Sequence, residues 1–181
     1  VPVQWQVSRD PQMKQVIRRG TVLTSSERDF TVKVDVRGLP AGNTYYYHFH
    51  ALGNNSITGK TKTAPRVGVE QLKFAVVSCS NYEWGYFSGY DRIARRTDLD
   101  AVIHLGDYFY EYADNASYSS PVIRDERVLF PAHETVTLGD YRTRFATYRL
   151  DPNLRHAHQQ HPFIVVWDDH ESANDGWTGG A

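Results

Sequence analysis

The sequence lacks the features that would place it in a specialised class of protein. Its 181 residues include a single cysteine, Cys79, so no disulfide can form within the chain. Lysine and arginine (20) balance aspartate and glutamate (21), without the cationic excess typical of nucleic-acid-binding surfaces. No apolar run approaches the roughly 18 residues that a membrane-spanning helix needs. The composition therefore predicts an ordinary globular protein, without a nucleic-acid-binding surface or a transmembrane segment.

The first third of the chain is typical of short β-strands. Apolar and polar residues alternate from Val3 to Val7 and again from Phe30 to Val36. A turn-rich stretch, 39–44, leads into a strand from Tyr45 to Ala51, and this turn resembles the tyrosine corner of fibronectin-like sandwiches. We expect residues 1–66 to form part of a fibronectin/immunoglobulin-like β-sandwich domain.

A different pattern begins at about residue 72, where apolar runs alternate with helical spacing. The expected strands are 74–78, 101–105 and 163–167, and the expected helices are 87–94 and a second that begins with Asp140 as its N-cap. This order is typical of βαβ units with a parallel sheet. The predicted fold class is thus α/β (α+β), with a second domain over residues 72–181.

Polar side chains follow each of these three strands at the point where it ends. The segments are Ser78-Cys79-Ser80-Asn81, Gly106-Asp107-Tyr108-Phe109-Tyr110 and Asp168-Asp169-His170-Glu171. Taken alone, a cysteine after a strand is more often a small buried side chain than a ligand, and Gly-Asp is a common turn. Four consecutive ionisable residues, however, would repel one another unless a cation neutralised them. Because open α/β sheets place their active sites at the carboxyl ends of strands, the three segments together predict a metal site.

The same segments resemble the motifs of a known family. Gly106-Asp107-x-x-Tyr110 looks like the metallophosphatase motif in which the aspartate bridges two metals, and 168–171 aligns with the Gly-Asn-His-Glu motif of that superfamily. Together with 78–87 they resemble the PhoD family of alkaline phosphatases, whose N-terminal sandwich also matches residues 1–65. The resemblance implies that the second domain is the first half of a metallophosphatase αββα sandwich.

This resemblance implies specific metal ligands. Cys79 would be a thiolate ligand to an iron ion, and Tyr110 would be a phenolate ligand to the same ion. Asp107 would bridge to a second divalent metal, which in this family resembles calcium, and Asp169 takes the place of the bridging-site asparagine. Thiolate and phenolate suit Fe(III), whereas carboxylate oxygens suit Ca²⁺.

The implied activity is hydrolysis of phosphate esters by a metal-activated hydroxide. His170 would protonate the leaving group or steady the phosphate, and Asn81 and Asp168 would be phosphate-binding or would support the metal ligands. The family also implies export, so we expect a secreted, periplasmic or cell-surface enzyme. Any targeting segment would lie outside this chain, because the sequence opens at Val1 without a basic apolar leader.

Several alternatives stay open. The same metals serve phosphodiesterase or phospholipase D-like activity, and residues 1–65 alone would suit a non-catalytic β-sandwich binding module. The His-x-His-x-x-His cluster of residues 156–161 favours a polar connection over a zinc site. The glycosylation sequon at Asn115 is expected to be unused.

The sequence also leads us to expect a fragment truncated at both ends. Only four or five of about seven sandwich strands precede residue 66. The histidine ligands that close the metal site in the superfamily would lie beyond residue 181. We therefore expect the isolated chain to be inactive or metal-poor.

Overall fold

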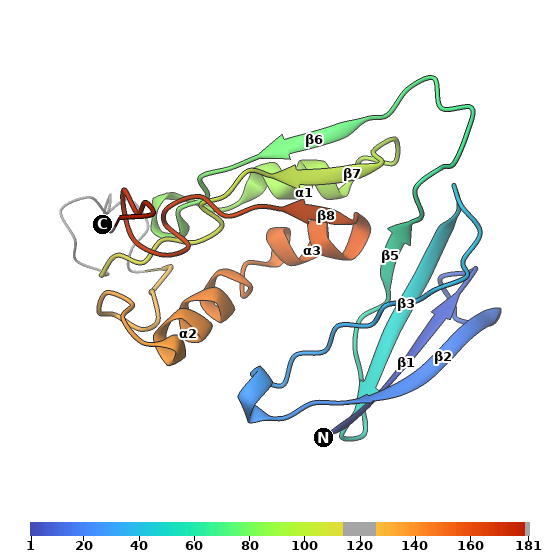
Figure 1. Ribbon diagram of the computed structural model, residues 1–181, viewed down its shortest axis with the longest axis horizontal. Coiled ribbons are helices and arrows are strands. Elements are labelled where there is room, and N and C mark those ends of the chain that lie inside the picture. Colours follow the sequence, from blue (N-terminus) through green and yellow to red (C-terminus); the bar gives the residue numbers. More distant parts are fainter. Residues whose placement is uncertain (114–125, 180–181) are drawn as a thin grey trace. The chain divides into compact units, whose positions relative to one another are not determined.

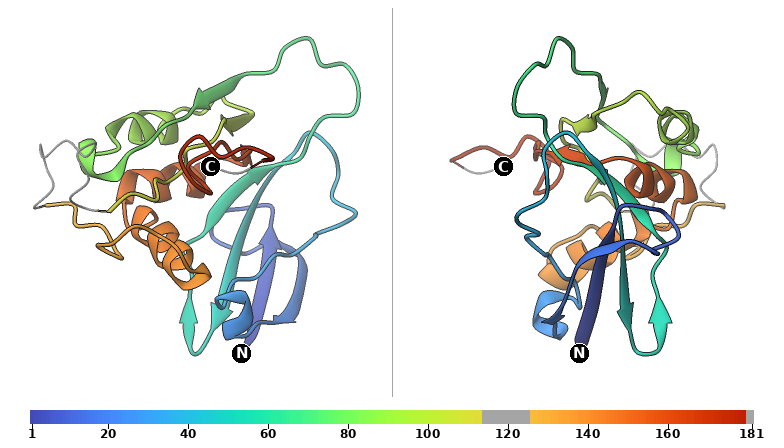
Figure 2. Two further views of the ribbon diagram at one scale, coloured as in Figure 1. Left: turned by 60° about the vertical axis from the view of Figure 1, so that its left-hand side comes forward. Right: turned by 90° about the vertical axis from the view of Figure 1, so that its right-hand side faces the viewer.

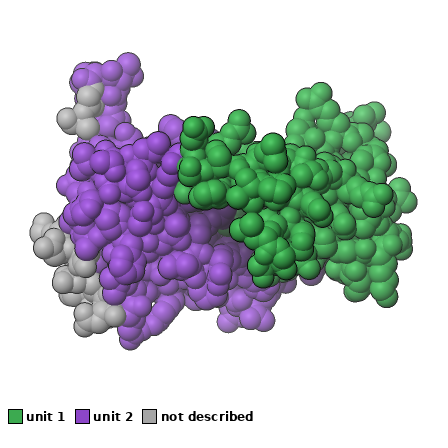
Figure 3. Space-filling model, turned by 90° about the horizontal axis from the view of Figure 1, so that it is seen from below, with its two compact units in different colours: residues 1–73, 158–162 green, residues 74–157, 163–181 purple. Residues whose placement is uncertain are grey.

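The computed structural model describes residues 1–113 and 126–179, which fall into two compact units (Figures 1 and 3). One unit contains residues 1–73 with 158–162, and the other contains residues 74–157 with 163–181. The sequon at Asn115 lies outside the described residues. Within the described residues, every helix is too short or too polar to cross a membrane.

The first unit is built on an antiparallel sheet. Its strands are β1 (Pro2–Ser8), β2 (Val16–Leu23), β3 (Thr44–Ala51), β4 (Asn54–Asn55) and β5 (Gly59–Lys62), with a short 3-10 helix, η1 (Ser26–Arg28), after β2. The order is β2-β1-β3-β4, and β5 also pairs with β3. Figure 2 shows the long strands β1, β2 and β3 side by side. The strands predicted around Val3–Val7 and Tyr45–Ala51 are confirmed.

Strand β2 was not predicted, because its sequence interrupts the expected alternation. Two arginines and Gly20 stand in its middle, where an amphipathic strand would carry apolar side chains. The glycine has a packing role: Trp5 lies opposite it in the ladder, and a Cβ at Gly20 would lie 2.8 Å from the indole ring. The absent side chain thus makes room for the Trp5 ring on β1.

The strand predicted from Phe30 to Val36 is wrong for the described residues, since this segment joins no ladder there. Its alternation nevertheless reports burial, because Val34 and Val36 line an apolar groove together with Trp5 and Tyr47. Alternation of apolar and polar residues indicates which side chains are buried, whereas a strand also needs hydrogen bonds to the backbone of a neighbouring segment. The segment packs as a strand would, without the hydrogen bonds of one.

The predicted tyrosine corner is present at the start of β3. Tyr45 is 1% exposed, and its hydroxyl donates to the Pro40 carbonyl oxygen over 3.3 Å. The bend between them is fixed by Gly42, which adopts a φ of +69°. The corner ties the turn to the strand that follows it.

Replacing Tyr45 by Phe should lower the free energy of unfolding of the first unit by about 1 kcal/mol, because a buried hydrogen bond is lost without loss of the ring. Urea denaturation followed by tryptophan fluorescence would measure the change. Tyr46→Phe is the matched control, since the Tyr46 hydroxyl makes no hydrogen bond to the described residues. Equal stability of the Tyr45→Phe variant and the wild type would show that the corner contributes nothing.

The second unit contains a parallel sheet in the order β6-β7-β8 (Figure 1). Its elements are β6 (Phe74–Val77), η2 (Tyr82–Trp84), α1 (Ser88–Ala94), β7 (Ala101–His104), α2 (Leu138–Tyr148), most of α3 (Pro152–Gln160) and β8 (Phe163–Val165). Residues 158–160, at the end of α3, belong to the first unit. Val77 pairs with His104, and His104 pairs with Val165. The predicted strands, the first helix and the parallel arrangement are therefore confirmed, and the mixed α/β class is correct.

Two details of the helices differ from the prediction. Helix α2 has Thr137 as its N-cap, with Asp140 at the third helical position, and the two side chains bond each other's backbone N–H in a capping box. The predicted polar connection around His156 and His158 is instead helix α3. Its apolar side, Leu154 and Ala157, is too short for helical spacing to stand out in the sequence.

The core of this unit lies on one face of the sheet. Tyr148 of α2 is fully buried against Tyr82 and Phe109, and Val77 and Phe163 of the sheet pack on the same cluster. The other face carries Val76 and Ile164, which are 60% and 55% exposed. The helices of the described chain therefore cover one face of β6-β7-β8.

Candidate metal centre at the strand ends

The three segments that follow β6, β7 and β8 meet at one edge of the sheet, because parallel strands end at the same side. Backbone hydrogen bonds continue past the strands. The N–H of Cys79 donates to the Gly106 carbonyl (3.2 Å), and the N–H of Ser80 donates to the Asp107 carbonyl (3.1 Å). The loops after β6 and β7 are thereby held side by side.

The Gly-Asp turn brings the end of β7 against the end of β8. Gly106 has a φ of +109° and Asp107 a φ of +51°. A Cβ on Gly106 would collide with the backbone of Asp168, within 2.5 Å of the Asp168 Cβ. Only glycine combines this backbone conformation with so close an approach. The turn therefore aims the Asp107 side chain between the two strand ends.

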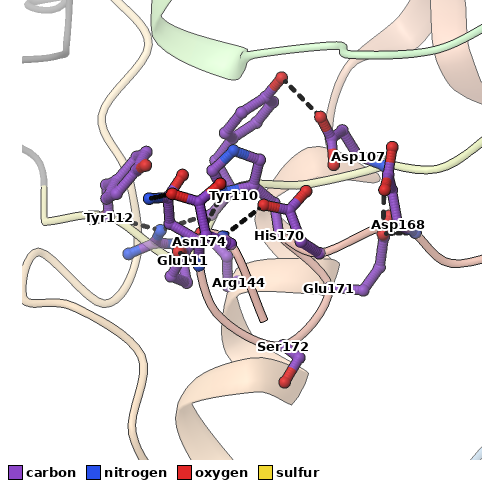
Figure 4. A network of polar contacts seen from close by, with 12 residues as sticks. Asp107, Tyr110, Glu111, Tyr112, Arg144, Asp168, His170, Glu171, Ser172 and Asn174 are labelled. Atoms are coloured by element: carbon purple, nitrogen blue, oxygen red, sulfur yellow. Dashed lines mark hydrogen bonds and ion pairs between the residues drawn. The ribbon is translucent and has the colours of Figure 1, made fainter. Parts of the chain in front are cut away.

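The Glu171 carboxylate joins the same two loops. It accepts from the backbone N–H groups of Asp107 (3.1 Å), Asp168 (2.8 Å) and Tyr108. Charge-assisted bonds of this kind are among the stronger hydrogen bonds in proteins. Glu171 thus anchors the loops by their backbones, as Figure 4 shows beside Asp107.

Three ligand-bearing side chains converge here. One ligand atom each of Asp107, Asp169 and His170 lies within 4.8 Å of the others. Asp107 is 6% exposed, and its Oδ1 is buried without a hydrogen-bond partner among the described residues, whereas Oδ2 accepts from the Tyr110 hydroxyl at 3.2 Å. A buried carboxylate oxygen without a donor is costly unless a cation completes it. The donor set of two carboxylates and an imidazole fits a metal ion.

The ionised form of the Asp169 carboxyl group is stabilised by its surroundings. The backbone N–H of Asp175 donates to Asp169 Oδ2 over 2.6 Å, and this bond lowers the pKa of the Asp169 carboxyl from its ordinary value. A carboxylate that stays ionised keeps its lone pairs available to a cation.

The orientation of His170 is set by a residue that the sequence reasoning missed. Glu111 is 2% exposed, and its Oε2 lies 2.8 Å from His170 Nδ1, while its Oε1 accepts from the Asn174 N–H at 2.7 Å. The Tyr110 ring lies against the imidazole, with ring centroids 4.3 Å apart. A carboxylate at Nδ1 favours a proton there and leaves Nε2 to act as a ligand, as a base when the imidazole is neutral, or as an acid when it is cationic.

A second missed residue is Arg144 of α2, which is fully buried. Its guanidinium donates to the carbonyl oxygens of Tyr110 (2.5 Å) and Tyr112 (2.8 Å) on the loop after β7. It also donates to the carbonyls of Phe130, Pro131 and His133 on the segment before α2. Arg144 therefore holds the backbone on both sides of Glu111 (Figure 4).

Cys79, Asn81 and Asp168, which the sequence also predicts as site residues, are not among the three side chains of this cluster. Cys79 is exposed and is not among the three side chains whose ligand atoms converge, although its loop is tied to that of Asp107. The Asn81 side chain caps η2 by accepting from the Glu83 N–H. The Asp168 side chain is exposed, and only its backbone contacts Glu171.

Comparison with known proteins places this arrangement in a family. The profile of the PhoD-like phosphatase family matches residues 74–181, and that of the PhoD-like phosphatase N-terminal domain matches residues 1–65. The chain is 42% identical to alkaline phosphatase D of Bacillus subtilis (strain 168) over 178 residues, which are 97% of this chain and 30% of that protein. The solved structure of PhoD superimposes with a TM-score of 0.89 at 40% identity, over 97% of this chain and 33% of that one. The chain thus spans about a third of the length of these relatives, and it belongs to the PhoD-like phosphatase family.

Proposed function

We propose that the protein carrying this chain is a metal-dependent phosphoesterase of the alkaline phosphatase type. The observation that carries the proposal is the convergence of Asp107, Asp169 and His170 at the strand ends, with a buried oxygen of Asp107 lacking any donor among the described residues. Membership of a phosphatase family supports the same reaction class. A β-sandwich binding module would leave this cluster without a role.

The proposed cofactors are Fe(III) and Ca²⁺. Asp107 would hold both ions, Tyr110 and Cys79 the iron, and Asp169 the calcium. The hydrogen bond between Tyr110 and Asp107 supports a shared site for these two side chains. The backbone bonds that tie the Cys79 loop to the Asp107 loop support a ligand role for the thiolate. The soft and the hard donors match the preferences of the two ions.

The bound cations would supply charge to stabilise the phosphoryl oxygens and would lower the pKa of a water. The chain's own contribution is orientation and proton handling. Glu111 holds Nδ1 of His170, so Nε2 is the atom that would meet the phosphate or its leaving group. The Tyr110 ring and the bond from Glu111 to the Asn174 N–H restrict the imidazole to this orientation.

A secreted, periplasmic or cell-surface location and a phosphoester substrate are part of the same proposal. The second candidate activity is phosphodiester hydrolysis, including phospholipase D-like action, because the same ligands can hold the metals for either ester.

Hydrolysis assays on the full-length protein test the function. We expect release of p-nitrophenol from p-nitrophenyl phosphate, and we expect His170→Ala to lower kcat by about a hundredfold or more, in line with loss of a general acid. Bis(p-nitrophenyl) phosphate and phosphatidylcholine, assayed in parallel, distinguish the diesterase alternative. A wild-type protein that hydrolyses none of these esters would contradict the proposal.

A further inference from the structure

A network of hydrogen bonds through buried side chains connects the loops that carry the proposed ligands Cys79 and Asp107. The Gly106 N–H donates to His104 Nδ1 (3.2 Å), His104 Nε2 lies 3.1 Å from the Tyr90 hydroxyl, and that hydroxyl lies 2.8 Å from Ser80 Oγ. His104 and Tyr90 are buried, at the end of β7 and within α1. None of these side chains belongs to the proposed metal ligands.

The donor and the acceptor of each hydrogen bond in this network follow from the first bond, between Gly106 and His104. Because the Gly106 N–H can only donate, His104 Nδ1 must accept, so the neutral imidazole carries its proton on Nε2. Nε2–H then donates to the Tyr90 oxygen, which leaves the phenolic proton to bond Ser80 Oγ. Burial lowers the pKa of His104, which supports the neutral form.

The two ends of this network are adjacent in sequence to proposed metal ligands. Ser80 directly follows Cys79, and Gly106 directly precedes Asp107. The loops that carry them are otherwise joined at this point by backbone bonds, from the N–H of Cys79 and of Ser80. Backbone hydrogen bonds at an exposed edge open readily, whereas a network of side-chain hydrogen bonds that includes core residues resists opening. Tyr90 lies in the hydrophobic cluster with Phe87 and Tyr148, and it thereby anchors the network in the core.

We propose that Tyr90 and His104 are positioning residues that hold the Cys79 loop against the Asp107 loop and so set the spacing of these two ligands. Without this network, only the backbone hydrogen bonds would join the Cys79 loop to the Asp107 loop. The two loops would then separate more often, and a metal that needs both ligands would bind less tightly. The effect on catalysis rests on the proposed function, while the effect on the loops does not.

Hydrogen exchange on the metal-free full-length protein tests the positioning directly. In Tyr90→Phe, which removes only the hydroxyl, the amides of Cys79 and Ser80 should exchange about tenfold faster, as expected for loss of one buried hydrogen bond. The amides of β7 report on global unfolding and should change little. Ser80→Ala removes the hydrogen bond at the outer end of the network and should also speed exchange at this loop. This variant tests the positioning if Tyr90→Phe disturbs the core. Tyr45→Phe, which removes a buried tyrosine hydroxyl bond in the other unit, is the control and should leave these amides unchanged.

Iron binding provides the second readout. We expect Tyr90→Phe to weaken Fe(III) binding by about tenfold or more, in the range that supporting residues of metal sites show. Unchanged exchange at Cys79 and Ser80 in both variants would overturn the proposal. Faster exchange in a protein whose wild type hydrolyses no phosphoester would support the positioning role and contradict the proposed function.

Discussion

Replacing Asp107 by Asn is expected to abolish metal binding and to lower phosphoester hydrolysis by more than about a hundredfold, a larger loss than that of a residue that only supports a ligand. The substitution is nearly isosteric, and an amide oxygen can still accept from the Tyr110 hydroxyl. What it removes is the negative charge at the buried Oδ1, which lacks a donor among the described residues. Elemental analysis and a p-nitrophenyl phosphate assay on the full-length protein would measure both effects.

Asp168→Asn is the matched control for this experiment. It removes the same charge from a carboxylate near the cluster, but the Asp168 side chain is exposed and its contact with Glu171 is made by the backbone. We expect less than about a tenfold change in rate, within the modest range of exposed electrostatic effects. Equal losses in the two variants would show that Asp107 has no special role.

Gly106→Ala is expected to destabilise the second unit by about 3 kcal/mol or more. A side chain at a φ of +109° is strained, and the added Cβ would also collide with the backbone of Asp168. Relief of the collision requires the ends of β7 and β8 to separate, which would also pull Asp107 away from Asp169 and His170. Thermal unfolding followed by circular dichroism would measure the loss, and metal titration would show the weakened site.

Gly89→Ala separates this effect from the general cost of changing a glycine. Gly89 lies in α1 with nothing within 4 Å of its Cβ position, so alanine should stabilise the helix by about 0.5–1 kcal/mol. If Gly106→Ala melts at the wild-type temperature, the close approach of the two strand ends is not required for the fold.

The position of the candidate metal site could be predicted from the sequence because the signal is local. Each ligand segment directly follows an apolar run, and Cys79, Asp107 and Asp169 stand within a few residues of the strand that carries them. Parallel strands then bring the segments to one edge without further information.

The support of the site could not be predicted in the same way, because its residues act across the fold. Glu111 meets His170 from 59 positions away, and Arg144 reaches back 34 positions to the Tyr110 carbonyl. A buried arginine on a helix and a glutamate after a tyrosine have ordinary surface roles in most sequences. Only the adjacency of Glu111 to Tyr110 in the Gly-Asp-x-x-Tyr motif was available as a signal.

In the first unit, the errors have one physical cause. Alternation from Phe30 to Val36 predicted a strand where only burial alternates, while β2 was missed because Gly20 accommodates the Trp5 ring. Apolar periodicity reports which side chains are covered, and pairing depends on a partner strand that the pattern does not encode. Tyr45 could be predicted because its corner is completed within five residues, at Pro40.

We propose that the strand-end cluster binds the cations on which phosphoester hydrolysis depends. The most direct test is to strip the full-length protein with a chelator and to follow hydrolysis of p-nitrophenyl phosphate while Fe(III) and Ca²⁺ are restored, in the wild type and in Asp107→Asn. We predict that activity is lost on stripping and returns with the metals in the wild type alone. Full activity of the stripped protein, or equal recovery in Asp107→Asn, would contradict the claim.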